Sequence, residues 1–111
     1  MTNTTNTTTN KSPEYFVSQW GYEQTNVSFY KVLKRTAQTV TLIKVKSRRT
    51  YIDRMNYVAV PVDELAPQAK PFRRKLRESF SNGDFYDYVW VNDFEKACKW
   101  DGTAADGSSS Y

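Results

Sequence analysis

Residues 72–91 read FRRKLRESFSNGDFYDYVWV, and they decide which fold is expected. The Asn82 and Gly83 pair supplies the positive φ angles that a tight type I′ hairpin turn requires. Residues 85–91 after it form an aromatic run with one aspartate as its only charge. Residues 72–80 fit a helix, because apolar side chains recur at every fourth position, but they also fit one face of a strand. The turn favours the strand, so we expect a β-hairpin over residues 72–91.

Upstream of this hairpin, four short runs rich in Val, Ile, Thr and aromatic residues alternate more often at period two than at 3.6, which is typical of β-strands. These runs cover residues 14–20, 27–34, 39–46 and 51–62. The alternation changes phase near Leu42 and Ile43, which predicts a β-bulge there. Pro61 indicates a sheet edge or strand exit. Residues 63–71 carry two prolines and are expected to form a surface loop.

A short helix is expected downstream, over residues 93–100. Asn92 can cap its N-terminus, Glu95 completes a variant of the capping box, and Gly102 follows its end. The apolar stripe of this helix consists of Phe94, Ala97 and Cys98. The sequence therefore predicts an α+β, mostly β fold: a small, strongly bent antiparallel sheet or partly open barrel of five to six strands with a short C-terminal helix.

The chain has 111 residues, which suits one domain. Residues 1–12 are nearly all Thr and Asn, and such a stretch cannot bury enough apolar surface to offset its ordering entropy, so we expect a disordered tail. Residues 13–102 are expected to form a single β-rich domain, and residues 103–111 a flexible C-terminal tail. The large side chains expected in the core include Phe29, Val58 and Trp90.

The composition excludes several kinds of chemistry. The chain has no histidine, which removes His-based triads, His-containing zinc sites and imidazole acid–base catalysis. Its single cysteine, Cys98, cannot form an intrachain disulfide or a multi-cysteine metal site, so a buried structural thiol is expected. No apolar run approaches the roughly 20 residues of a membrane-spanning helix, and the first residues do not resemble a signal peptide. We expect a non-enzymatic, soluble, cytoplasmic protein with no cofactor, no metal and no membrane partner.

Charge is segregated along the chain, and the formal net charge is +4. Residues 31–54 hold eight basic residues against one acid, residues 70–77 hold five more, and residues 78–106 hold seven acids against two lysines. Basic segments that share one face would attract a phosphate backbone, and interleaved tyrosines would stack on bases, as in proteins that bind single strands. The candidate nucleic-acid-binding residues are Lys44, Lys46, Arg48, Arg49, Tyr51, Arg73, Arg74, Lys75 and Arg77. A solvated strand face explains the same charges without a ligand.

The segment after Gly21 is dense in hydrogen-bonding groups for its length. Tyr22, Gln24 and Asn26 are therefore candidates for recognising a partner protein. Side chains of this kind also satisfy the backbone groups of a turn, and that alternative explains the composition equally well.

Four short motifs resemble a group of small uncharacterised proteins of bacteriophages and other mobile elements. They are GYEQTN at residues 21–26, the Phe29 and Tyr30 pair, RRK at residues 73–75 and WDG at residues 100–102. The resemblance covers about residues 15–102 and implies a protein that acts inside a bacterial host. It implies no activity, ligand or site residue.

The leading hypothesis from these observations is a non-enzymatic β domain that binds nucleic acid, single-stranded or without sequence preference, with its basic and aromatic face. The alternative is a protein-interaction module that inhibits or modulates a host enzyme or defence system, using the segment after Gly21 and the acidic C-terminal hairpin. A third possibility is a small structural subunit of a virion.

Overall fold

The computed structural model describes residues 14–21, 25–81 and 83–108, and these residues form nine β-strands and no helix. The strands are β1 Tyr15–Trp20, β2 Asn26–Arg35, β3 Thr39–Tyr51, β4 Asn56–Leu65, β5 Phe72–Lys75, β6 Arg77–Ser81, β7 Asp84–Trp90, β8 Lys96–Lys99 and β9 Ala105–Ser108. The fold is therefore all-β. The prediction of an α+β fold with five to six strands and a C-terminal helix is wrong.

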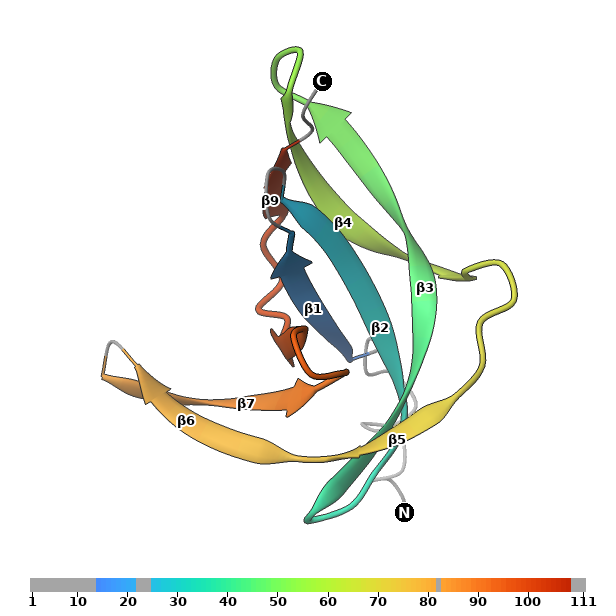
Figure 1. Ribbon diagram of the computed structural model, residues 1–111, viewed down its shortest axis with the longest axis vertical. Helices are drawn as coiled ribbons and strands as arrows, with labels where there is room; N and C mark the ends of the chain where they lie inside the picture. The colour runs from blue at the N-terminus through green and yellow to red at the C-terminus, as the bar shows by residue number, and fades with distance from the viewer. Residues whose placement is uncertain (1–13, 22–24, 82, 109–111) are drawn as a thin grey trace, which may run out of the picture.

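The strands form one antiparallel sheet that curls into a half-barrel (Figure 1). Its order is β6-β7-β8-β1-β2-β3-β4-β9, and β5 pairs with β3 outside this path. Only Leu76 separates β5 from β6, so the segment that pairs with β3 continues directly into the strand at the far end of the order. The Leu76 N–H donates to Gln38 O at 2.8 Å and holds this crossing point. The hairpin of β6 and β7 projects away from the other strands (Figure 1).

The sheet has a hydrophobic cluster on each face. One cluster, which we call the inner core, consists of Phe16, Tyr30, Val40, Leu42, Val89 and Ala97. The other, the outer core, consists of Tyr15, Val27, Phe29, Val45, Tyr57 and Ala59. Neighbouring residues of a strand point to opposite faces, so β1 and β2 bury side chains on both sides. This two-sided burial explains why their sequences carry consecutive apolar residues rather than strict alternation.

A hairpin is confirmed between β6 and β7, and so is the choice of strand over helix for residues 72–80, but the expected hairpin bounds of 72–91 are too wide, because residues 72–75 pair with β3. Ser81 pairs with Asp84, and Gly83 in the turn has φ +86°. A side chain is strained at that φ, which explains the glycine. The run is divided at Leu76, however, into β5 on β3 and β6 on β7.

The helix expected over residues 93–100 is a turn followed by β8. Asn92 Oδ1 accepts from the Phe94 N–H at 3.0 Å, and the Val91 N–H donates to Glu95 O at 2.8 Å. Ala97 of β8 then pairs with Val89 of β7. The four residues of β8 follow helix-capping signals, yet they form a strand, because they pair with β7 on one side and with β1 on the other. Here pairing with strands that are distant in sequence outweighs the local propensity.

Other expectations also change. Two register irregularities flank the position expected for the bulge: one in β2 between Val32 and Lys34, opposite Leu42, and one in the β3–β4 pairing between Val45 and Ser47. Neither lies at Leu42 and Ile43 themselves. β4 continues to Leu65, which shortens the loop expected over residues 63–71. β9 lies in the segment expected to be a C-terminal tail and pairs with β4.

Of the three expected core residues, Phe29 is confirmed, with no exposed surface. Val58 is only partly buried. Trp90 is 43% exposed, so its assignment to the core is wrong.

Candidate nucleic-acid interface

A hollow with cationic walls lies where β3 leaves β2. Pairing of these strands stops at Phe29 and Val45, and β3 pairs beyond that point with β4. The resulting hollow of about 480 Å³, which we call the fork groove, has residues 26–29 on one side and residues 44–47 on the other. Its polar and aromatic lining includes Trp20, Asn26, Lys44, Lys46, Ser47 and Arg49, with Ala66 and Pro67 from the β4–β5 connection. Three predicted cations therefore share one groove with a tryptophan.

The cations of the fork groove differ in their contacts. Lys44 is exposed. Lys46 Nζ lies 2.7 Å from Glu64 Oε2, and both side chains are about half exposed. An exposed pair of this kind contributes about 0–1 kcal/mol, so a phosphate can displace the carboxylate at small cost. The Arg49 guanidinium lies 4.4 Å from the centroid of the Tyr57 ring, which fixes its position by a cation–π contact.

Aromatic groups lie beside these cations. The Trp20 indole N–H donates to Ser28 Oγ at 3.2 Å, which orients the ring along the groove wall. The Tyr51 and Tyr57 ring centroids are 5.2 Å apart at 53°, so Arg49, Tyr57 and Tyr51 lie together on one face of the β3–β4 hairpin. Arg48 pairs with Val60 and occupies the opposite face of that hairpin.

The other predicted basic residues lie elsewhere on the sheet. Arg73 and Lys75 pair with Thr41 and Thr39, at the end of β3 away from the fork groove, and both are exposed. Arg77 is exposed on β6. The nine candidate residues therefore form separate groups along β3 and the β5–β6 segment rather than one patch.

Arg74 serves the fold. Its Nε and Nη2 donate to Val91 O at 3.2 and 3.0 Å, and its guanidinium lies 4.8 Å from the Phe72 ring centroid. These contacts tie β5 to the end of β7, so Arg74 is not an available phosphate ligand.

The expected partner-binding segment is only partly described. Tyr22 and Gln24 lie outside the described residues, and Asn26 begins β2 and lines the fork groove. The backbone before it is anchored to β9. The Thr25 N–H donates to Ser108 Oγ, and the Ser108 N–H donates to Thr25 O, both at 3.0 Å.

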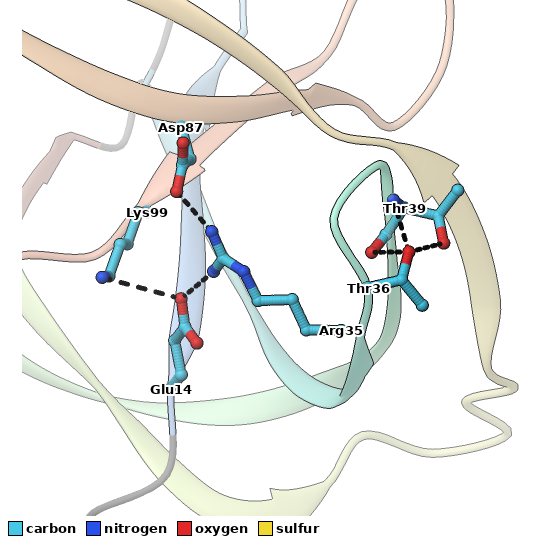
Figure 2. Close-up of polar contacts among 6 residues, drawn as sticks. All are labelled: Glu14, Arg35, Thr36, Thr39, Asp87 and Lys99. Carbon is cyan, nitrogen blue, oxygen red and sulfur yellow. Dashed lines mark hydrogen bonds and ion pairs between the residues drawn. The ribbon is translucent and has the colours of Figure 1, made fainter.

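A network of charges joins the ends of β2 and β8, the middle of β7 and the residue before β1 (Figure 2). Arg35 Nη1 and Nη2 each lie 2.5 Å from a carboxylate oxygen, of Glu14 and Asp87 respectively, and Lys99 Nζ lies 3.8 Å from Glu14. Because Arg35 already binds two carboxylates, it belongs to the fold rather than to a phosphate site.

Glu95, which was expected to complete a capping box, is a buried acid. It is 6% exposed, and its Oε2 accepts from Ser18 Oγ at 2.5 Å and from Tyr30 Oη at 2.8 Å. These hydrogen bonds satisfy a carboxyl oxygen that is buried beside the inner core. Burial and the hydrogen bond to Glu95 raise the pKa of Tyr30 far above its ordinary value. The arrangement holds the turn before β8 against β1 and β2.

The described residues show little that resembles a reactive centre. Burial raises the pKa of the partly buried Cys98 thiol, which disfavours the nucleophilic thiolate. Within residues 14–21, 25–81 and 83–108, no three metal-ligating side chains are grouped closely enough to hold an ion. The same residues contain no helix that could span a membrane.

Comparison of the chain with protein-family models, curated protein sequences and solved structures gives no match.

Proposed function

We propose that this protein is a non-enzymatic nucleic-acid-binding domain that contacts phosphates through the fork groove. The observation that carries the proposal is the convergence of Lys44, Lys46 and Arg49 on one groove that also contains Trp20. Lys and Arg release counterions when they neutralise phosphates, and this supplies most of nonspecific affinity. An aromatic ring beside such cations is typical of grooves that bind single strands.

Arg73, Lys75 and Arg77 on β5 and β6 are also exposed cations. They would extend the proposed contact if the bound nucleic acid runs past these two β-strands. The proposal assigns them phosphate contacts outside the groove. It also assigns the protein to the cytoplasm of a bacterial host, in keeping with the resemblance to proteins of phages and mobile elements.

Fluorescence anisotropy of labelled single-stranded and double-stranded DNA and RNA tests the proposal at about 50 and about 200 mM salt, a range over which phosphate contacts weaken strongly. The test variant is Lys44→Gln with Lys46→Gln. The matched control is Lys34→Gln with Arg54→Gln, which removes the same charge from exposed positions outside the groove. We expect the slope of log K against log salt to fall in magnitude by about 2 in the test variant, about 1 for each phosphate contact.

Two outcomes would overturn the proposal. One is the absence of binding to any of these nucleic acids at 50 mM salt. The other is equal weakening in the groove variant and in the control, because net charge alone would then explain the binding.

One observation favours the alternative of a protein-interaction module. Phe80 and Phe85 at the end of the β6–β7 hairpin are 58% and 68% exposed, and their ring centroids lie 4.9 Å apart. Exposed aromatic pairs of this kind are common at protein interfaces. A stoichiometric host protein retained from nuclease-treated lysate, and lost with Phe80→Ser and Phe85→Ser, would favour this function.

A further inference from the structure

Three aromatic residues of β7 lie on one face of the sheet and outside both cores. Tyr86, Tyr88 and Trp90 are alternate residues, so their side chains point to the same side. The ring centroids of Tyr86 and Tyr88 are 6.0 Å apart, and those of Tyr88 and Trp90 are 6.4 Å apart. We call these three residues the aromatic ladder. None of them belongs to either hydrophobic cluster.

The ladder carries positive charge beside its rings. Lys96 on β8 pairs with Trp90, and its Nζ lies 4.9 Å from the Tyr88 ring centroid and 5.8 Å from that of Tyr86. Arg77 on β6 pairs with Tyr88 from the other side. Both cations are exposed.

Most carboxylates of β6 and β7 lie on the face of the sheet opposite the aromatic ladder. Glu78 and Asp87 pair with each other and alternate with the ladder residues, so they lie on the opposite face. Asp87 is held there by Arg35. Asp84 shares the ladder face but lies at the turn end of β7. Tyr86 also lines a hollow with Glu78, Asp87 and Asp101. The central residue Tyr88, however, has a cation on each neighbouring strand, and these two cations complement a chain of phosphates rather than an acidic surface.

We propose that the aromatic ladder stacks the unpaired bases of a single-stranded nucleic acid while Lys96 and Arg77 contact its phosphates. The proposal rests on the proposed function and specifies its ligand class. Bases of a duplex are stacked on each other and cannot reach these rings, whereas splayed bases of a single strand stack on aromatic side chains of a sheet surface.

The test compares two labelled strands of about ten nucleotides, a length within the range of single-strand sites. One is an oligothymidine and the other is an abasic strand of the same length, which has the phosphates without the bases. We expect the protein to bind the oligothymidine at least tenfold more tightly, because each stacked base contributes roughly a fivefold to hundredfold gain in affinity.

The variant that removes the ladder is Tyr86→Leu, Tyr88→Leu and Trp90→Leu, which keeps apolar bulk on the sheet. It is expected to bind both strands with the affinity of the wild-type protein for the abasic strand. Trp90→Phe keeps an aromatic ring, so it should retain more of the preference for the oligothymidine over the abasic strand than Trp90→Leu does. Phe94→Leu removes an exposed ring of the neighbouring turn, which is outside the ladder, and serves as the control.

The outcomes separate this inference from the proposed function. Equal affinity of the wild-type protein for the two strands, with both weakened by the Lys44 and Lys46 variant, would overturn the ladder and leave the fork groove supported. No binding to either strand would overturn both. A ladder variant that keeps its preference for bases but loses a host protein would overturn base stacking in favour of a protein ligand.

Discussion

At the scale of single residues, Gly107 illustrates how closely β9 is packed. It pairs with Tyr57, which is 1% exposed and donates from Oη to Thr25 O at 3.2 Å. A Cβ on Gly107 would lie 2.5 Å from Tyr57 Oη and overlap the ring. The ring has little freedom to move, because Arg49 covers it from another direction. A glycine in a segment of small polar residues is thus a packing residue of the outer core.

Gly107→Ala is therefore expected to lower the free energy of unfolding by about 1–3 kcal/mol, the usual cost of overpacking. Urea unfolding measures the change, with Asp106→Ala at the exposed neighbouring position as the control. Combining Gly107→Ala with Tyr57→Leu, which removes the ring that the Cβ would overlap, should cost less than the sum of the two single changes. Strict additivity would contradict the contact.

At the scale of elements, the Arg35 network fixes where three strands meet. Arg35 at the end of β2 lies between Glu14, just before β1, and Asp87 in β7 (Figure 2). Its side chain is 31% exposed and those of the two acids are 29% and 25% exposed. Isolated surface ion pairs contribute little to the stability of a protein. A guanidinium that pairs with two partly buried carboxylates forms a network, and a network is expected to contribute more.

Arg35→Ala should lower the free energy of unfolding by about 1 kcal/mol at low salt, because two carboxylates then lose their shared cation. At about 1 M salt, where the Debye length is about 3 Å, the difference from wild type should shrink. Unfolding curves at both salt concentrations measure this, and Lys34→Ala, an exposed neighbour, is the control. A deficit that is independent of salt would indicate lost packing instead of lost charge pairing.

The elements also show which parts of the fold were predictable. The hairpin of β6 and β7 was predictable because the Asn82 and Gly83 pair favours the turn locally, but the pairing of residues 72–75 with β3 was not. β8 was not, because residues 92–95 carry sound helical capping signals and the strand is imposed by neighbours far away in sequence. β9 was missed for the same reason: four small and polar residues show no strand pattern, yet β4 pairs with them.

At the scale of the whole molecule, the candidate site depends on a feature that no local pattern encodes. The sequence identified the basic residues, but their grouping follows from the point at which β3 leaves β2 for β4. That point brings Lys44, Lys46 and Arg49 together with Trp20, and places Arg73 and Lys75 at the other end of β3. The aromatic ladder was visible as alternation in residues 85–91, but the sequence did not indicate that Trp90 would be exposed and Tyr86 and Tyr88 only partly buried.

The inner core gives the whole fold a specific sensitivity to alkali. Tyr30 is 5% exposed and donates to Glu95, and burial with this hydrogen bond raises the pKa of its phenol far above the ordinary value. Below the unfolded-state pKa of about 10, both states keep the proton and the full contribution to stability is present. Above it the unfolded chain releases the proton while the folded protein retains it, so the contribution declines as pH rises towards the folded-state pKa.

Urea unfolding of the wild-type protein and of Tyr30→Phe, at about pH 8 and at about pH 10.5, just above the ordinary tyrosine pKa, tests this sensitivity. The wild-type protein should lose more stability than Tyr30→Phe between the two conditions. Burial also raises the pKa of Tyr15, but that residue is present in both proteins, so the comparison isolates Tyr30. An equal loss in the two proteins would show that the Tyr30 phenol ionises as readily in the fold as in the unfolded chain, and would contradict its burial against Glu95.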